Sequence, residues 1–255
     1  MSLIEIRQVS KTFKGPEEEL LALDNVSFDI EDGEFLAIVG PSGCGKSTIL
    51  RMIAGLDFPT KGQILFQGKP INRPSPAISM VFQSFALLPW KTARENVLIA
   101  LEAKEMSREK KEETARTLLK TLGLEGFEDD YPGELSGGMR QRVGIARALA
   151  VAPNVLLLDE PLSSLDELTA RELRIEMLRI WRDRTTYPDT VVLVTHMVEE
   201  AVIMADRVLV MSPRPGKIIA EVRIDIPRPR FDYTRSPIFF QHVDQIETIL
   251  EAHHG

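Results

Sequence analysis

A glycine-rich segment at residues 40–48, G-P-S-G-C-G-K-S-T, constrains the fold of this chain more than any other feature. It follows an apolar run at residues 35–39 and precedes a segment with helical character at residues 49–55. The order of strand, loop and helix fits the pattern G-x-x-x-x-G-K-[ST]. Glycines let the backbone turn tightly and bring its N–H groups against phosphate oxygens, and the helix points the positive end of its dipole at the same anion. The segment therefore predicts a binding site for a nucleoside triphosphate.

Each residue type in this loop has a chemical reason. Lys46 supplies a point charge for the outer phosphates, and the hydroxyl of Ser47 is placed to ligate Mg²⁺. A chance lysine in a glycine turn would lack the flanking strand and helix, so we interpret the loop as functional. The residues assigned to nucleotide binding are Gly40, Pro41, Ser42, Gly43, Cys44, Gly45, Lys46, Ser47 and Thr48.

The length and the net charge of the chain limit the classes of protein to which it can belong. A chain of 255 residues suits one large α/β domain, or a core with a smaller subdomain. The content of 44% hydrophobic and 27% charged residues is that of an ordinary globular protein. The formal net charge of −7 argues against nucleic acid as a partner, because nucleic-acid binders usually carry a basic excess. The net charge of the whole chain does not exclude a local basic patch.

A single cysteine, Cys44, excludes an intrachain disulfide and fits a reducing cytoplasm. A thiol beside a helix N-terminus can have a lowered pKa, but we interpret Cys44 as a small buried residue. Residues 1–5 lack a basic-then-apolar leader, and no apolar run approaches the length of a membrane span. Any association with a membrane must therefore come through a partner.

Periodicity predicts a mixture of strand types. Alternating patterns predict several short antiparallel strands, whereas continuous apolar runs favour parallel strands buried on both faces. The alternating segments are residues 3–9, 22–30 and 62–68, and the apolar runs are residues 35–39, 155–158 and 190–194. Residues 207–211 and 217–219 predict a closing hairpin, and residues 14–19 a solvated turn.

The hydrophobic pattern changes between residues 84 and 150, where no strand is predicted. We therefore interpret this region as a helical insertion. An amphipathic helix is expected from Ser107 to Leu122, with Gly123 ending it. A longer helix follows at residues 168–184, with an apolar stripe that includes Trp181. We interpret residues 227–255 as a loosely packed end, with partner contacts through residues 239–240 or 253–254 as the alternative.

Two carboxylates end the apolar run at residues 155–158. The carboxyl end of a parallel strand is where open α/β sheets bind their ligands. Asp159 suits Mg²⁺, because hard cations prefer oxygen ligands. Glu160 can take a proton from a water that attacks the terminal phosphate. An Asp-Glu pair alone leaves open a purely structural role.

A second glycine-rich helix start lies at residues 135–141, L-S-G-G-M-R-Q. A helix that runs to Ala150 begins with Ser136, Gly137 and Gly138. These small residues leave the N–H groups of its first turn accessible to phosphate. One chain needs only one such loop per triphosphate. A second loop suggests that two chains share each nucleotide.

With these motifs in place, residues 2–225 resemble the ATP-binding cassette of ABC transporters. The segment at residues 135–141 is similar to the signature sequence of that family, and is the most specific element. The resemblance implies that Phe13 stacks on adenine, that Gln83 of the Q-loop senses Mg²⁺ and the γ-phosphate, and that His196 is the switch histidine. Without the resemblance, His196 would be interpreted as a packed histidine at a strand end, and Phe13 could be a core residue.

The D-loop is matched by residues 163–166, with Ser164 where the family more often has alanine. The resemblance implies a P-loop NTPase (RecA-like) α/β core, an antiparallel β subdomain and a helical signature subdomain. The expected divisions are residues 1–82 and 151–225 for the core with its β subdomain, 83–150 for the helical subdomain and 226–255 for the tail.

The family mechanism implies a homodimer of cassettes packed head to tail in the ATP-bound state, with ATP and Mg²⁺ as cofactors. Three roles follow for residues of this chain. The catalytic residues would be Glu160, His196 and Gln83. The metal ligands would be Ser47, Gln83 and Asp159. The second subunit would add Ser136, Gly137, Gly138 and Gln141 to the nucleotide.

A transporter role requires separate integral membrane permease subunits. Residues 85–90, F-A-L-L-P-W, would line the groove for a permease helix, although Trp90 could equally pack inside the helical subdomain. Short segments at residues 87–90, 95–97 and 211–218 look like those of the nitrate/sulfonate/taurine importer cassettes. This resemblance implies import of a small anionic solute, delivered by an extracytoplasmic solute-binding protein.

Other classes fit less well. A soluble ABC-type ATPase of DNA maintenance would carry a long coiled coil between Ser47 and Ser136, where this chain has no heptads. A translation factor would need two cassettes, and a nucleotide kinase would lack the segment at residues 135–141. The transported solute is not encoded in a subunit of this kind.

Overall fold

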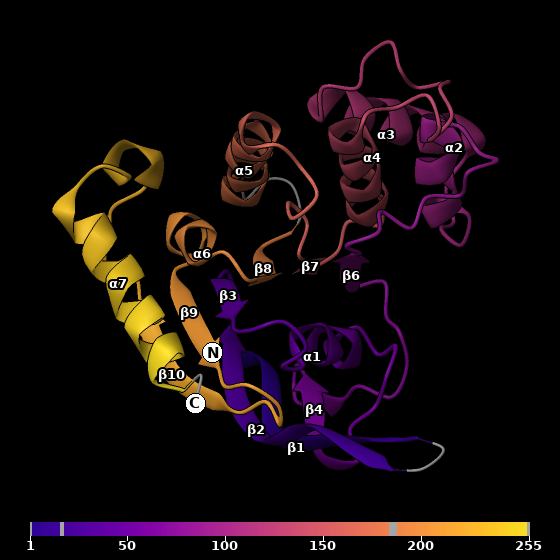
Figure 1. Ribbon diagram of the computed structural model, residues 1–255. Helices are drawn as coiled ribbons and strands as arrows, with labels where there is room; N and C mark the ends of the chain where they lie inside the picture. The colour runs from indigo at the N-terminus through magenta and orange to yellow at the C-terminus, as the bar shows by residue number, and fades with distance from the viewer. Residues whose placement is uncertain (1, 16–17, 184–187, 254–255) are drawn as a thin grey trace. The chain divides into compact units, whose positions relative to one another are not determined.

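A computed structural model describes residues 2–15, 18–183 and 188–253 (Figure 1). The chain folds into two compact units. The first combines Met1–Ser75 with Thr190–Gly255, and the second is Pro76–Asp189. The predicted division into core, helical subdomain and tail is based on the positions of motifs, whereas these two units are defined by their compactness. That division remains a prediction.

The first unit contains an antiparallel sheet in the order β2-β1-β4-β5. The antiparallel pairing predicted for the N-terminal strands is confirmed. Both long strands extend beyond their alternating segments, because pairing of β1 with β2 continues through several register shifts. The strands are β1 (Ser2–Lys14), β2 (Glu19–Glu31), β4 (Lys61–Phe66) and β5 (Lys69–Pro70).

The same unit holds the buried parallel strands. β3 pairs in parallel with β8 on one side and with β9 on the other, and β10 pairs antiparallel with β9. Every residue of β3 and β8 is buried, as the continuous apolar runs predict. Helix α6 packs on β3 and β8, and α1 packs on β8. These elements are β3 (Phe35–Val39), α1 (Lys46–Ile53), β8 (Thr190–Thr195), α6 (Val198–Met204), β9 (Arg207–Met211) and β10 (Ile218–Arg223).

The second unit is mainly helical around one parallel strand pair, β6 with β7. Helices α2, α3 and α4 pack on one another. Between Val81 and Val155 the structure has helices and turns but no strand, so the predicted helical insertion is confirmed. The elements are β6 (Ile78–Val81), α2 (Ala93–Leu98), η1 (Ile99–Leu101), α3 (Arg108–Thr121), α4 (Gly137–Ala150), β7 (Val155–Asp159) and α5 (Glu167–Arg182).

Side-chain caps fix where the helices of the second unit begin. Ser107 caps α3 as predicted, its Oγ accepting a hydrogen bond from the Lys110 N–H at 3.3 Å. Asp166 caps α5 through the Thr169 N–H, so α5 begins one residue before the predicted start. The predicted end at Arg184 lies outside the described residues. No described helix has both the length and the apolar character that a bilayer span requires.

The C-terminal segment is packed, so the prediction of a loose end is wrong. It forms η2 (Arg230–Tyr233) and α7 (Pro237–Ala252), and α7 lies against α6 and β9 (Figure 1). Phe239 is 2% exposed, and Val243 and Ile246 are buried beside it. The spacing of these three residues places them on one helix face, which gives α7 an apolar side to bury.

Arg230 fastens this segment to the first unit. It is 3% exposed and donates hydrogen bonds to the backbone carbonyls of Ile226, Val202, Ala205 and Ile224. Burial lowers the pKa of Arg230 to about 10, and the carbonyls compensate the loss of hydration. No sequence pattern predicts these contacts, because their acceptors are backbone carbonyls.

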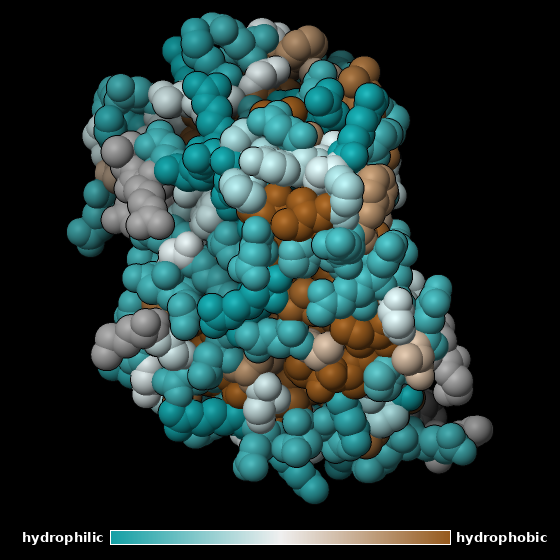
Figure 2. All heavy atoms as spheres, turned by 90° about the vertical axis from the view of Figure 1, so that its left-hand side faces the viewer, coloured by the Kyte–Doolittle hydropathy of each residue, from teal (hydrophilic) through white to brown (hydrophobic). Residues whose placement is uncertain are grey.

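The α7 side of the molecule is shown in Figure 2, where hydrophobic patches lie among hydrophilic side chains. Helix α7 buries Phe239 but leaves Ile238 and Phe240 exposed by 39% and 47%. The rings of Phe239 and Phe240 meet edge to face, with centroids 6.0 Å apart. Phe239 is therefore a core residue and is unavailable to a partner. His253 is exposed, and His254 lies outside the described residues.

Replacement of Phe239 by alanine tests the packing of α7. We expect Phe239→Ala to lower the free energy of unfolding by about 3–5 kcal/mol, because a buried aromatic side chain leaves a cavity. The matched control is Phe240→Ala, which removes the exposed neighbour and should cost less than about 1 kcal/mol. Chemical denaturation measures both values. Equal and small losses in the two variants would mean that α7 does not contribute to the core.

Candidate nucleotide-binding site

The phosphate loop joins β3 to α1, as predicted. Gly43 and Gly45 adopt φ angles of +76° and +108°, which side chains rarely tolerate. A Cβ atom at Gly45 would lie 2.5 Å from Leu23 Cδ2, so the close approach of β2 also requires glycine there. Gly45 is the N-cap residue of α1, which leaves the first N–H groups of the helix without intrahelical acceptors. This cradle fits a phosphate group.

The side chains of Lys46 and Cys44 are buried in the loop. Lys46 is 4% exposed, and its Nζ donates to the carbonyls of Gly40 and Pro41 at 2.8 and 3.1 Å. The ammonium group is therefore held against the loop whose N–H groups would face the phosphates. Cys44 is 1% exposed, which supports its interpretation as a small buried residue. Ser47 lies in the first turn of α1.

His196 lies at the same sheet edge as the phosphate loop. Val39 pairs with Thr195 in the parallel register of β3 and β8, so Gly40 and His196 each follow a paired residue. His196 is exposed, whereas Thr195 is buried and donates to the carboxylate of Glu200. His196 and the phosphate loop thus leave the sheet at the same level, and the contact of His196 with a terminal phosphate remains a prediction.

Phe13 lies on β1 and is 39% exposed, which excludes the alternative of a core residue. Its ring lies 5.0 Å from Lys11 Nζ, and its register partner is Leu20 on β2. Three residues further along β2, Leu23 contacts Gly45. An exposed aromatic side chain on the strand pair that borders the loop suits adenine stacking, which remains a prediction.

The second unit brings together Gln83, Asp159 and Glu160. β6 and β7 run in parallel, with Val81 opposite Leu158, so both chain segments emerge at one edge. Gln83 Nε2 donates to Glu160 Oε2 at 3.4 Å. Asp159 ends β7 and is 4% exposed. These three predicted residues therefore form one polar cluster.

The backbone of Glu160 is in the left-handed region, at a φ of +46°. Such a conformation costs an ordinary side chain about 1–3 kcal/mol and is concentrated at functional sites. The carbonyl of Glu160 accepts a hydrogen bond from Ser163 Oγ at 3.0 Å, which helps to hold the turn. The D-loop residue Asp166 caps α5, and the hydrogen bond from the Thr169 N–H lowers the pKa of Asp166.

The signature segment begins α4 as predicted. Ser136 caps the helix through the Met139 N–H at 3.2 Å. A Cβ atom at Gly138 would lie 2.5 Å from Thr169 Cγ2, so the start of α5 requires glycine at this position. Gly137 has more room, with the nearest side-chain atom at 3.8 Å. The first turn of α4 remains suited to an anion.

Gln141 requires a correction. Its side chain is 0% exposed, and neither amide atom has a hydrogen-bond partner among the described residues. A side chain without accessible surface offers no atom to a nucleotide in this conformation. The direct contact between Gln141 and ATP is therefore not supported, although its position on α4 near the signature glycines is as expected.

The segment after Gln83 is held by residues that the sequence analysis did not single out. Phe85 and Ala86 have φ angles of +60° and +48°. Arg147, on α4, donates to the carbonyls of Ala86 and Phe85 at 2.6 and 3.0 Å. Burial lowers the pKa of Arg147, and no carboxylate pairs with it among the described residues. The Arg140 guanidinium adds a contact with the Phe85 ring at 5.7 Å.

Asn96 anchors the rest of this segment and was also not predicted. It is 0% exposed, and its amide bonds to both backbone groups of Leu88 and to the carbonyls of Lys91 and Thr92. Trp90 is 69% exposed, so it does not pack inside the helical unit. A fixed backbone thus presents an exposed aromatic side chain. The only sequence signal was the family-like stretch at residues 95–97.

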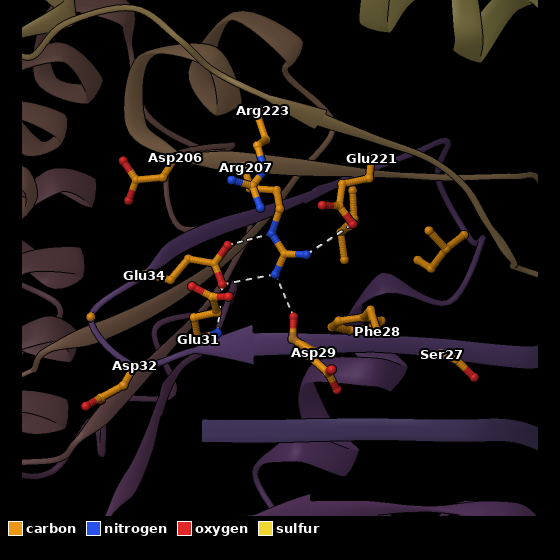
Figure 3. A pocket seen from close by; sticks show the side chains of 13 residues that line it. Ser27, Phe28, Asp29, Glu31, Asp32, Glu34, Asp206, Arg207, Glu221 and Arg223 are labelled. Carbon is orange, nitrogen blue, oxygen red and sulfur yellow. Dashed lines mark hydrogen bonds and ion pairs between the residues drawn. The ribbon is translucent and has the colours of Figure 1, made fainter. Parts of the chain in front are cut away.

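A pocket of about 570 Å³ lies elsewhere in the first unit, between the end of β2 and the β9–β10 pair (Figure 3). Arg207 sits at its centre and bonds to Glu34, Glu221 and the carbonyl of Asp29. Burial acts to lower the pKa of Arg207, but the two carboxylates outweigh it and raise the pKa. None of the predicted site residues lines this pocket, and its ion pairs join the strands.

The fold and these two clusters define a P-loop ATPase. Residues 23–163 match the family model described as ABC transporter. The chain belongs to the ABC transporter family, as an ATP-hydrolysing cassette. The predicted fold class and enzyme class are thereby confirmed.

Individual relatives agree over nearly the whole chain. An uncharacterized ABC transporter ATP-binding protein, MJ0412 of Methanocaldococcus jannaschii, is 46% identical and covers 97% of this chain and 91% of its own. The nitrate import ATP-binding protein NrtD of Synechocystis sp. is 42% identical, covering 98% and 95%. The bicarbonate transport ATP-binding protein CmpD of Synechococcus elongatus is 42% identical, covering 88% and 81%.

A solved structure shares the fold. The ATP-binding cassette MJ0796, determined as a dimer in a post-hydrolysis state with ADP and Pi, is 36% identical. It superposes with a TM-score of 0.77 over 88% of this chain and 100% of its own.

Hydrogen exchange can test whether Arg147 restrains the segment that follows Gln83, residues 85–91. We expect Arg147→Met to speed amide hydrogen exchange at residues 85–91 by about tenfold or more, because two charge-assisted hydrogen bonds are lost. Arg116→Met is the matched control, since Arg116 is exposed on α3 and makes none of the recorded side-chain contacts. Hydrogen exchange followed by mass spectrometry gives the rates. Unchanged exchange at residues 85–91 would show that Arg147 does not restrain the segment.

Proposed function

We propose that this chain is the ATP-hydrolysing subunit of an importer for a small anionic solute, acting with separate membrane permease subunits. The observation that carries the proposal is the hydrogen-bonded Gln83–Glu160 pair next to the segment that exposes Trp90. It links the hydrolytic carboxylate to a partner surface within a few residues of backbone. The named functions of NrtD and CmpD, nitrate import and bicarbonate transport, support an anionic solute.

The residues present fit a nucleotide with Mg²⁺. The glycine cradle and Lys46 provide N–H groups and a cation for phosphates, and Ser47, Gln83 and Asp159 provide the oxygen donors that Mg²⁺ prefers. Bound Mg²⁺ would neutralise charge on the phosphate oxygens. Ser47 is in the first unit, whereas Gln83 and Asp159 are in the second.

Hydrolysis then needs a base and a contact for the terminal phosphate. Glu160 accepts the proton of the attacking water, and Gln83 orients the Glu160 carboxylate through its amide N–H. His196 contacts the terminal phosphate from the end of β8. The strained backbone of Glu160 fixes the direction of its side chain, which supports a catalytic role over a structural one.

The first turn of α4 has its proposed role in a dimer, where two chains share each nucleotide. We infer that Ser136, Gly137 and Gly138 complete the nucleotide site of a second copy in a head-to-tail homodimer. The bare first turn of α4 supports this inference, and MJ0796 is a dimeric cassette. Loss of contacts with the terminal phosphate would let the dimer open.

The partner is proposed to be an integral membrane permease that binds beside Trp90. An exposed aromatic residue on a hydrogen-bonded backbone is a common anchor at interfaces. The chain would then lie peripherally on the cytoplasmic face of the inner membrane and depend indirectly on an extracytoplasmic solute-binding protein. The net charge of −7 supports the expectation that nucleic acid is not a partner.

The alternative of a soluble ATPase in DNA maintenance or translation gains no support. Between Ser47 and Ser136 the longest helix is α3, which spans 14 residues and packs on α2 and α4 rather than forming a coiled coil. Affinity purification from detergent-solubilised membranes decides between the classes. Recovery with a small multi-span subunit supports the importer, whereas recovery with nucleic acid or ribosomes overturns it.

Glu160→Gln tests the base. We expect ATP binding to persist, hydrolysis to fall at least about 100-fold, and the chain to accumulate as an ATP-bound dimer, because the amide cannot accept the proton. ATPase assays and size-exclusion chromatography with ATP measure these effects. Glu247→Gln, an exposed change on α7, is the control and should retain full hydrolysis. Full hydrolysis by Glu160→Gln would remove Glu160 as the base.

Ser136→Arg tests the shared site. We expect ATP affinity in the isolated chain to stay within about twofold while turnover is lost, because the bulky cation blocks the anion site of the opposite copy. Ser107→Arg is a matched control, since it removes an equivalent helix cap at a cost of about 1 kcal/mol. Calorimetric titration and ATPase assays give both readouts. Normal turnover by Ser136→Arg would contradict a site shared between two chains.

A further inference from the structure

The turn that joins β9 to β10, residues 212–217, packs directly against the phosphate loop. A Cβ atom at Gly216 would lie 2.0 Å from the carbonyl oxygen of Cys44, so the two backbones are in close contact. The Gly216 N–H donates to the Ala22 carbonyl at 2.9 Å, and the Asp24 N–H donates to the Gly216 carbonyl at 3.1 Å. The turn is thus held between β2 and the phosphate loop.

Hydrogen bonds inside this turn fix its shape. The backbone of Ser212 pairs with Lys217, and Ser212 Oγ accepts from the Lys217 N–H at 3.0 Å. The same hydroxyl lies 2.9 Å from the Pro213 carbonyl and 3.2 Å from that of Pro215. An ion pair between Lys217 and Asp24 at 2.8 Å ties the turn to β2. The position of the residue at its tip, Arg214, is therefore defined.

Arg214 reaches over the phosphate loop. Its Nη2 atom lies 3.7 Å from the place that a Cβ atom at Gly43 would occupy. The side chain is exposed, and among the described residues it has no recorded hydrogen bond or ion pair. By contrast Lys217, also in the turn, is neutralised by Asp24. An unpaired guanidinium beside an anion cradle is notable in a chain with a net charge of −7.

We propose that Arg214 is a second cationic contact for the phosphates of a bound nucleoside di- or triphosphate, in addition to Lys46. A guanidinium forms charge-assisted, bidentate hydrogen bonds with phosphate oxygens, and it stays charged at every physiological pH. Arg214 reaches the loop from the solvent side at Gly43, whereas the Lys46 ammonium group lies against Gly40 and Pro41. The two cations therefore approach the phosphate chain from different parts of the loop.

Charge alone does not account for this arrangement. Arg223, at the far end of β10, is also exposed and has no recorded side-chain partner among the described residues, but it lines the pocket of Figure 3 and not the phosphate loop. The difference between the two arginines is their place on the hairpin. That difference supplies a matched control for the proposal.

Calorimetric titration of the isolated chain with ATP and with ADP tests the proposal. We expect Arg214→Gln to raise the Kd for both nucleotides about tenfold and to weaken the dependence of Kd on salt, because one charged contact is lost. Arg214→Lys should recover part of the affinity, and Arg223→Gln should leave the Kd unchanged. Thermal denaturation confirms that the variants are folded, which is expected because neither arginine packs in the core.

Two outcomes would overturn the proposal. One is a Kd of Arg214→Gln within twofold of the wild-type value for both nucleotides. The other is an equal rise in Kd for Arg223→Gln, which would reveal a general charge effect. Lys46→Ala is measured in parallel, since it disables the phosphate loop itself. The proposal rests on that loop alone, so it can fail while ATP binding and the proposed importer function stand.

Discussion

Parallel backbone pairing between β3 and β8 is the constraint on which the first unit depends. The two strands are buried on both faces, so their register is fixed by packing as well as by hydrogen bonds. Because Val39 lies opposite Thr195, the phosphate loop and His196 leave the sheet at the same level. A shift by one residue would turn the apolar side chains of β3 to the opposite faces and move the loop away from the histidine.

Helix α4 plays the corresponding part in the second unit. Its first turn carries Ser136 and the two glycines, and its last turn carries Arg147, which holds the carbonyls of Phe85 and Ala86. The half-buried guanidinium has no carboxylate partner in the part of the chain that the structure describes, so those carbonyls compensate its lost hydration. One helix thus carries both the signature residues and the arginine that holds the segment exposing Trp90.

Much of this arrangement could be predicted because its signals are local. The phosphate loop, the caps at Ser107 and Ser136, and the buried apolar strands each follow from a few adjacent residues. Contacts with distant backbone were missed: Arg147 bonds to a carbonyl 61 residues away, and no side-chain pattern marks a carbonyl acceptor. The prediction for the tail was wrong because Phe239, Val243 and Ile246 are spaced to form one apolar helix face, which packs on α6 and β9. Gln141 follows the signature glycines in the chain, but its side chain faces the protein interior.

The groups predicted to bind the nucleotide are found in both units. Lys46 and the glycine cradle belong to the first unit, whereas Asp159, Glu160 and the signature turn belong to the second. Phosphate oxygens suit the cation and N–H groups of the first set, and a divalent metal suits the carboxylates of the second. A ligand changes a conformational equilibrium only through contacts that differ between its states. The terminal phosphate is the group that hydrolysis removes, so the residues that touch it, and not those that bind the whole nucleotide, must control the change of state.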